Sequence, residues 1–252
     1  MTASEQIKLK APQDIKILKK AGRILSSIVK ETSRSLKSGM TTRQLDAIAE
    51  KLINEHDVTP AFKGYRGFPA CCCISVNEEV VHGIPGDKVI REGDIVSIDV
   101  GIIYQEFYSD TAVTVGVGKI NSKLQQLLEV TRQSLYEGIK QAKPGNHLGD
   151  VSHAIQKYVE DRKFSIVRDF VGHGIGKNLH EAPEIPNFGS PHTGPILKEG
   201  MVIAIEPMVN VGTWQTRICQ DGWTVVTADG QPSAHFEHSL AITADGPLIL
   251  TE

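Results

Sequence analysis

Two aspartates stand inside a run of apolar, strand-forming residues. Residues 95–115 read IVSIDVGIIYQEFYSDTAVTV, with Asp99 in the first apolar stretch and Asp110 in the second. Burying an ionised carboxylate is costly unless it meets a cation or a hydrogen-bond donor. A hairpin that turns at Tyr104-Gln105 predicts that the two acids face each other directly, with Cβ atoms ~4.5–5.5 Å apart. Because neither stretch contains lysine or arginine, a divalent metal is the favoured partner.

A second pair of acids occurs later in the chain in a similar setting. The segment EGDIVSID is answered by EGMVIAIE, which ends at Glu206, and Glu237 follows in HFEHSLAIT. A KSG/KPG pair and an Ala-Ile pair recur at nearly the same offset as these segments. The recurrence predicts an internal duplication, approximately residues 12–115 and 121–243, within a single catalytic domain of residues 1–252.

Apolar residues at helical spacing predict four helices, at residues 12–36, 41–57, 121–142 and 149–163. The breaker KSGMTT ends the first helix, and Thr41 or Thr42 can cap the second. Each half then has two helices followed by an antiparallel β segment. The predicted fold class is α+β, with pseudo-two-fold halves around a central antiparallel sheet.

Histidines in glycine-rich turns complete a hydrolytic set. HGI occurs at His82 and again at His173, which is followed by His180 in GHGIGKNLHEAP. Four carboxylates and one imidazole form an oxygen-rich site that suits Mn, Fe(II), Co or Zn in a bridged pair. Two such ions ~3.5–4 Å apart can activate a shared water and polarise a carbonyl, and a further histidine can then contact the substrate amide. These residue types predict aminopeptidase-like chemistry.

Composition excludes several other classes. The chain has 252 residues, 40% of them hydrophobic, and a net charge of −3, which does not indicate nucleic-acid or anionic-membrane binding. No apolar run approaches the ~20 residues of a membrane span, and the N-terminus lacks a secretory pattern, so we expect a cytoplasmic protein. The cysteines Cys71, Cys72, Cys73 and Cys219 form no CxxC pair or disulfide framework, and small buried side chains are expected.

Together, the segments FPACCCISVNEEVVHGIP, GDIVSIDVGIIYQEFYSDTAVT, VGHGIGKNLHEAP, VIAIEPMV and FEHSLAIT resemble type I methionine aminopeptidases of the pita-bread fold, in their short bacterial form. The resemblance covers nearly the whole chain. It implies two divalent metal ions (cobalt, manganese, iron(II) or zinc) held by Asp99, Asp110, His173, Glu206 and Glu237. Asp110 and Glu237 would bridge the ions, Asp99 would chelate one, and His173 and Glu206 would complete the other.

The same resemblance implies roles around the metals. Glu206 corresponds to the proton shuttle, and His82 and His180 to the histidines that contact the substrate amide and carbonyl. A methionine pocket would be drawn from Tyr65, Phe68, Cys73, Leu179 and Trp223. Phe62 and Leu179 stand where relatives can have Cys and Phe, and Cys71 and Cys72 are expected near the pocket entrance.

The expected activity is hydrolytic removal of the initiator methionine from nascent chains whose second residue is small. Its own Thr2 would then make the protein a candidate substrate. The expected partners are the nascent N-terminus and the ribosome near its exit tunnel, without nucleic-acid specificity, membrane binding or oligomerisation. The segment NVGTWQTRICQDGW has one basic residue, so the Lys-rich first helix is the alternative docking surface.

Two other interpretations are open. One is an Xaa-Pro aminopeptidase or prolidase with the same five ligands, although such enzymes usually carry an extra N-terminal domain that 252 residues cannot hold. The other is a metal-free pita-bread module that binds peptides without catalysis. Such modules lose ligands, whereas all five matching positions are intact here.

Overall fold

The computed structural model describes residues 6–252, so the expectation about Thr2 lies outside it. Its four long helices begin and end close to the predicted positions: α1 (Pro12–Ser35), α2 (Thr42–Glu55), α3 (Ser122–Gln141) and α4 (Leu148–Glu160). Local chemistry explains their starts. Pro12 occupies the first turn of α1, where a missing N–H is harmless. The Thr41 side chain accepts from Gln44 N ahead of α2, and Asn121 accepts from Leu124 N at the start of α3.

Each helix buries one apolar stripe against the strands. In α1 this stripe contains Leu18, Ala21, Leu25 and Ile28, which are at most 1% exposed. Burial of a leucine or isoleucine side chain stabilises the fold by roughly 1.5–3 kcal/mol, so the stripe fixes the helix on β4 and β5. Among residues 6–252, no helix is long and apolar enough to cross a membrane.

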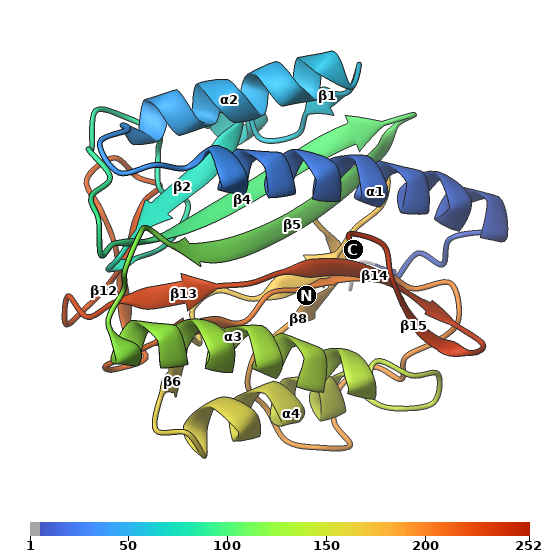
Figure 1. The fold of residues 1–252 in the computed structure, drawn as a ribbon. Helices are drawn as coiled ribbons and strands as arrows, with labels where there is room; N and C mark the ends of the chain where they lie inside the picture. Colours follow the sequence, from blue (N-terminus) through green and yellow to red (C-terminus); the bar gives the residue numbers. More distant parts are fainter. Residues whose placement is uncertain (1–5) are drawn as a thin grey trace.

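The strands form antiparallel ladders between the two helix pairs, α1 with α2 and α3 with α4 (Figure 1). Their bounds are β1 (Thr59–Pro60), β2 (Cys72–Val76), β3 (Glu79–Val81), β4 (Ile95–Tyr104), β5 (Phe107–Gly116), β6 (Ser165–Ile166), β7 (Gly172–Gly174), β8 (Glu181–Ile185), β9 (Val202–Ile205), β10 (Met208–Asn210), β11 (Thr216–Ile218), β12 (Val225–Thr227), β13 (Ser233–His235), β14 (His238–Thr243) and β15 (Gly246–Ile249). One ladder contains β1, β4, β2 and β5, and another runs β15-β14-β9-β7-β8. Helices and antiparallel sheets in this arrangement confirm the α+β class.

The order of elements is similar in the two stretches of the predicted duplication. Helices α1 and α2 precede the long pair β4 and β5, while α3 and α4 precede β9 and β14. Each helix pair lies on the outer side of the strands that follow it (Figure 1). The duplication itself stays a prediction.

The hairpin of β4 and β5 has a different register from the predicted one. Its ladder pairs Gly101 with Asp110 and Asp99 with Ala112, so the two aspartates are diagonal neighbours on one face. The two central turn residues are Gln105 and Glu106, with φ of 47° and 67°. Left-handed conformations at both positions are typical of a type I′ turn. The predicted direct opposition is therefore wrong by two positions, because this turn lacks the Asn-Gly signal that usually marks it.

Hydrogen bonds to backbone carbonyl groups join the two halves beside Asp110. Glu237 N donates to Ala112 O at 2.9 Å, and Thr111 Oγ1 donates to Glu237 O at 2.6 Å. Ser239 Oγ donates to Asp110 O at 2.8 Å. These bonds attach the Glu237 segment to β5 and so bring an acid of the second half next to the acids of the first.

Gly22 allows α1 to lie directly on the C-terminal segment. A Cβ atom at Gly22 would lie 2.1 Å from the carbonyl oxygen of Leu250. Overpacking of this kind costs about 1–3 kcal/mol, and contact with rigid backbone favours the upper end. We expect Gly22→Ala to lower the free energy of unfolding by about 2 kcal/mol, despite a gain of about 1 kcal/mol in helix propensity.

Chemical denaturation measures this change. Ser27→Ala, on the exposed face of the same helix, is the matched control and should alter stability by less than about 0.5 kcal/mol. Equal stability of the two variants would show that α1 does not depend on this close approach.

Candidate metal centre

All five expected ligands line one cavity of about 180 Å³. Asp99 lies on β4, Asp110 on β5, and His173 on β7, while Glu206 directly follows β9 and Glu237 stands between β13 and β14. Strands from both halves of the chain therefore contribute to one site. The cavity is lined by Phe62, Tyr65, Arg66, Phe68, Cys73, His82, Asp99, Asp110, His173, Leu179, His180, Glu206, Trp223 and Glu237.

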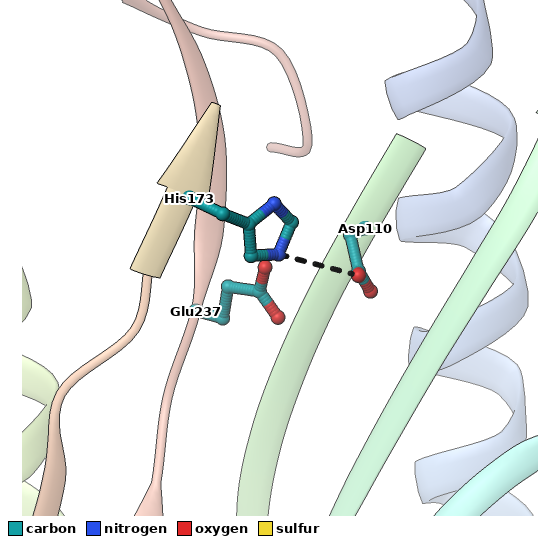
Figure 2. Close-up of side chains that lie close together, drawn as sticks. All are labelled: Asp110, His173 and Glu237. Atoms are coloured by element: carbon teal, nitrogen blue, oxygen red, sulfur yellow. Dashed lines mark ion pairs between the residues drawn. The ribbon is translucent and has the colours of Figure 1, made fainter. Parts of the chain in front are cut away.

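Three of these side chains form the tightest group. One ligand atom each of Asp110, His173 and Glu237 lies within 4.8 Å of the others, and all three residues are buried (Figure 2). His173 Nε2 is 4.0 Å from Asp110 Oδ2 and 3.7 Å from Glu206 Oε1. Since hydrogen-bond distances are shorter than this, the group is spaced for an ion between its members rather than for direct contact.

Burial makes these carboxylates unfavourable as free anions. It raises the pKa of Asp99 to about 7, and it raises the pKa values of Asp110 and Glu237 well above the ordinary range, with neighbouring carboxylates adding to the effect. Asp99 Oδ1, Asp110 Oδ1 and Glu237 Oε1 are buried without a hydrogen-bond partner. Among residues 6–252, the ion pairs of the cavity carboxylates are all with histidine. Oxygen ligands without donors fit a divalent cation.

Glu206 differs from the other acids because imidazoles surround it. Burial by itself raises the pKa of Glu206, but His235, His173 and His82 together lower it below its ordinary value. His235 Nε2 lies 3.3 Å from Glu206 Oε2, and His235 is only 1% exposed. Glu206 is therefore a carboxylate at neutral pH.

Sequence reasoning missed His235. It occurs in SAHFEH, two residues before Glu237, and no feature of that segment connects it with Glu206. The contact arises because His235 ends β13 and Glu206 lies between β9 and β10, and β10 pairs with β13. One indication of His235 was present in the sequence: this histidine stands two residues before Glu237, an expected ligand.

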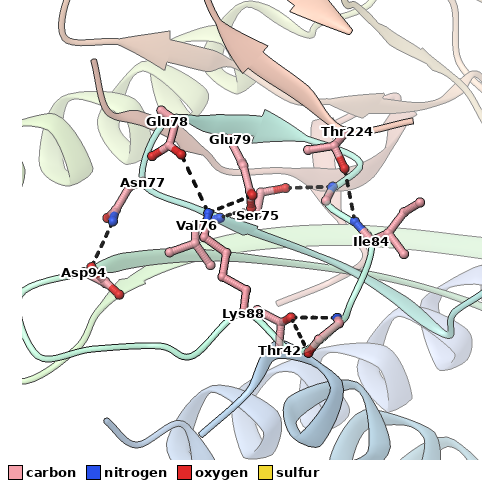
Figure 3. Close-up of polar contacts among 12 residues, drawn as sticks. Thr42, Ser75, Val76, Asn77, Glu78, Glu79, Ile84, Lys88, Asp94 and Thr224 are labelled. Atoms are coloured by element: carbon pink, nitrogen blue, oxygen red, sulfur yellow. Dashed lines mark hydrogen bonds and ion pairs between the residues drawn. The ribbon is translucent and has the colours of Figure 1, made fainter. Parts of the chain in front are cut away.

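Residue His82 stands at the cavity in a strained backbone conformation. Its φ is 59°, in the left-handed region that non-glycine residues rarely adopt. The next two residues are held by hydroxyl groups: Gly83 N donates to Ser75 Oγ at 3.1 Å, and Ile84 N to Thr224 Oγ1 at 3.5 Å (Figure 3). Burial lowers the pKa of His82, so the imidazole is neutral at pH 7.

His180 lines the same cavity, beside His173. Their ring centroids are 4.3 Å apart, and Tyr65 OH is 2.9 Å from His180 Nδ1. Burial, with His173 adding to it, lowers the pKa of His180 to about 4. The ring is therefore neutral at pH 7 and has one nitrogen available toward the cavity.

An apolar wall adjoins the charged side of the cavity. Phe68 and Trp223 pack edge to face with centroids 5.1 Å apart. The expected pocket residues all line this cavity: Tyr65, Phe68, Cys73, Leu179 and Trp223, together with Phe62. The wall is thus formed by large, weakly polar side chains next to the carboxylates.

The three consecutive cysteines have different surroundings. Cys73 pairs with Asp99 across β2 and β4 and lines the cavity. Cys71 and Cys72 are fully buried outside it, and their backbone N–H groups both donate to Asp46 Oδ1 at 3.0 Å. The expectation that Cys71 and Cys72 lie near the pocket entrance is therefore wrong. Burial raises the pKa of Cys71 to about 12 and that of Cys73 well above its usual value, so both remain thiols.

Comparisons with known proteins agree with this geometry. Residues 16–244 match the model of metallopeptidase family M24. Methionine aminopeptidase 1 of Bacillus subtilis is 51% identical over 242 residues, which cover 96% of this chain and 98% of the relative. The crystal structure of methionine aminopeptidase from Thermotoga maritima superposes with a TM-score of 0.96 at 48% identity, covering 98% of this chain and 100% of that one. The prolidase from Pyrococcus horikoshii gives a TM-score of 0.78 at 25% identity, and only 63% of its chain is covered.

The raised carboxylate pKa values predict an unusual pH dependence for the metal-free protein. Above the ordinary carboxylate pKa, and up to their raised folded pKa values, folded Asp99, Asp110 and Glu237 retain protons that the unfolded chain has lost. The free energy of unfolding should therefore fall as pH rises, by roughly 1.4 kcal/mol per pH unit for each retained proton. The lowered pKa values of His82, His180 and His238 act in the opposite sense, but only below the ordinary histidine pKa of 6.5.

Denaturation of chelator-treated protein at pH 6.5 and pH 8 measures this slope. Added Mn(II) should restore stability more at pH 8 than at pH 6.5, because metal ligands must be deprotonated. Rising stability between these pH values without metal would contradict the burial of protonated carboxylates.

Proposed function

The chain belongs to metallopeptidase family M24, and we propose that it is a methionine aminopeptidase that removes the initiator methionine when the second residue is small. The supporting observation is a cavity in which four carboxylates and His173 adjoin an apolar wall sized for one side chain. The similar proteins named methionine aminopeptidase match nearly end to end, whereas much of the prolidase chain is not covered. This favours the methionine enzyme over the prolidase alternative.

As a member of a metallopeptidase family the protein binds divalent metal, and we propose two ions per chain. Asp99, Asp110, His173, Glu206 and Glu237 would hold them, with Asp110 and Glu237 shared between the two. Cobalt, manganese, iron(II) and zinc all suit this donor set. Which of these metals occupies the site then depends on which is available. When bound, such ions lower the pKa of water and polarise a carbonyl group.

Glu206 and the two neutral histidines supply the proton chemistry. Glu206, whose pKa is lowered chiefly by His235, accepts a proton from water at a carboxylate oxygen and can return it to the leaving amine. Tyr65 OH lies 2.9 Å from His180 Nδ1. In the tautomer that accepts the Tyr65 proton at Nδ1, the Nε2 proton of His180 binds the substrate carbonyl. His82, fixed by its backbone, contacts the substrate amide from the other side.

The apolar wall selects the methionine side chain. A thioether is polarisable and packs well against aromatic rings, which Phe68 and Trp223 provide. Cys73 lines the same wall, and its raised pKa keeps the thiol protonated. Its uncharged, polarisable sulfur can therefore pack against the methionine thioether. Since the peptide backbone must approach the carboxylates closely, a large second side chain would collide with the cavity rim.

We place this activity on nascent chains in the cytoplasm. Cys71, Cys72 and Cys73 are adjacent buried thiols without disulfides, as expected in a reducing compartment. The N-terminus of a nascent chain is the partner, the ribosome near its exit tunnel is the surrounding assembly, and the protein acts as a monomer.

Hydrolysis of short peptides tests the specificity. We expect Met-Ala-Ser to be cleaved with kcat/KM at least about tenfold above that of Met-Lys-Ser, because one steric misfit in a pocket is worth roughly 1–3 kcal/mol. An Xaa-Pro peptide should be a poor substrate. Equal rates for the two methionine peptides would refute the small-residue rule, and turnover of Xaa-Pro alone would select the prolidase alternative.

Three substitutions separate metal binding from proton transfer. His180→Ala should lower kcat by about 10²–10³ with metal content unchanged, because it removes a donor to the substrate carbonyl. Glu206→Gln should lower kcat by at least about 10²–10⁴ and weaken metal binding, because the amide cannot accept the proton. Asp99→Ala should reduce metal content first.

Elemental analysis of each purified variant, beside its steady-state kinetics, distinguishes these roles. Loss of all metal from His180→Ala would make that residue a ligand and overturn its assignment.

A further inference from the structure

A buried ion pair ties the N-terminal segment to the turn that carries His180. Lys10 Nζ donates to Glu181 Oε2 at 2.5 Å, and the two side chains are only 7% and 4% exposed. Glu181 directly follows His180 and begins β8. Removing two charges from water offsets most of their attraction, so such a pair is weak evidence for stability alone. Its position next to His180 indicates a role in the geometry of the site.

Both charged groups have further partners that link them to the turn. Lys10 Nζ also donates to Lys8 O at 3.1 Å, a hydrogen bond within the N-terminal segment before α1. Glu181 Oε1 accepts from Asn178 N at 3.1 Å. The Glu181 carboxylate therefore connects both ends of the turn at residues 178–181. His180 lies inside that turn.

The surroundings of Lys10 are close-packed and anchored on both sides. A Cβ atom at Gly176 would lie 2.4 Å from Lys10 Cε and 3.0 Å from Glu181 Oε1, so a side chain there would displace the pair. Gly176 O accepts from Tyr108 N at 2.8 Å, on the strand that carries Asp110. Lys10 N itself donates to Gly200 O at 2.7 Å, just before β9. The ion pair thus lies between two backbone positions, Lys10 and Gly176, that are each held by a backbone hydrogen bond.

The other face of the turn forms part of the cavity. His180 lines it, and its imidazole has one side-chain hydrogen bond among the described residues, to Tyr65. Lys10 does not line the cavity and so does not touch the reacting groups. The orientation of His180 therefore depends largely on the backbone that the ion pair holds.

We propose that Lys10 is a positioning residue for catalysis: through Glu181 it fixes the 178–181 turn so that the His180 imidazole faces the substrate carbonyl. This inference rests on the proposed aminopeptidase function. It assigns a catalytic consequence to the N-terminal segment before α1, which lies outside the ligand and pocket motifs.

Lys10→Met is the first variant, because it keeps an unbranched side chain and removes the charge. We expect kcat for Met-Ala-Ser to fall by roughly 100-fold, as for a catalytic group displaced by about 1 Å, while KM changes less than about threefold. Metal content should stay unchanged. Lys8→Met is the matched control, since Lys8 is exposed and contributes only its carbonyl group, and its kcat should stay within about twofold. An unchanged kcat in Lys10→Met would overturn the proposal.

A double variant separates positioning from simple stability. Lys10→Met alone leaves Glu181 buried and unpaired, whereas Lys10→Met with Glu181→Met removes both charges. We expect the double variant to regain the melting temperature lost in the single one but to keep the low kcat. Recovery of kcat together with the melting temperature would show that the pair serves the fold alone.

A cycle with His180→Ala tests whether Lys10 acts through that residue. In the His180→Ala background, Lys10→Met should change kcat by less than about twofold, because coupled positions are not additive. A full 100-fold effect in that background would overturn the assignment to His180.

Hydrogen exchange gives a readout that does not require activity. Backbone amides of residues 176–182 in the metal-loaded protein should exchange faster in Lys10→Met than in Lys8→Met, and equal rates would show that the pair does not hold the turn. If the unsubstituted protein failed to cleave Met-Ala-Ser, the proposed function would fail, while this measurement would still decide whether Lys10 holds the turn.

Discussion

The burial of negative charge between the two halves of the chain is the constraint on which the structure depends. Asp110 and Glu237 lie on segments from different halves, and each keeps a carboxylate oxygen without a hydrogen-bond donor. In the absence of a cation, burial raises the pKa values of both groups and so disfavours their ionised forms. Divalent metal provides the missing positive charge, so the element that enables catalysis also offsets the cost of bringing the halves together.

The scaffold around these charges is correspondingly rigid. Long apolar strands β4 and β5 hold the first pair of acids, and α1 covers them with a fully buried stripe. Hydrogen bonds from Thr111 and Ser239 then lock the segment of Glu237 onto β5. Repulsion among carboxylates would separate flexible strands. The hydrogen bonds between the halves hold the ligand-bearing segments together against this repulsion.

Histidines divide the cavity into regions with different proton chemistry. The pKa of Glu206 is lowered chiefly by His235 beside it, while burial raises the pKa of Asp99 when no metal is bound. His82 and His180 are neutral for the opposite reason, since burial disfavours their cationic forms. An ionised carboxylate and neutral imidazoles thus line one cavity at the same pH. The same amino-acid types serve different purposes because their surroundings differ.

The sequence alone determined those features that depend on neighbours along the chain. Helical periodicity, Pro12 and the capping Thr41 located the helices to within a few residues. Their position inside apolar strands singled out Asp99, Asp110, Glu206 and Glu237, which the fold brings to one cavity. Tertiary structure decided what depends on distant contacts. The left-handed turn at Gln105 and Glu106 set the register of the aspartates. Pairing of β10 with β13 brought His235 to Glu206. Tertiary packing placed Cys73, but neither Cys71 nor Cys72, at the cavity and closed the Lys10–Glu181 ion pair. Capping and periodicity act over a few residues, so the local sequence reveals them. A pairing register or a buried contact depends on backbone conformations that many sequences can adopt, and packing of the whole chain selects among them.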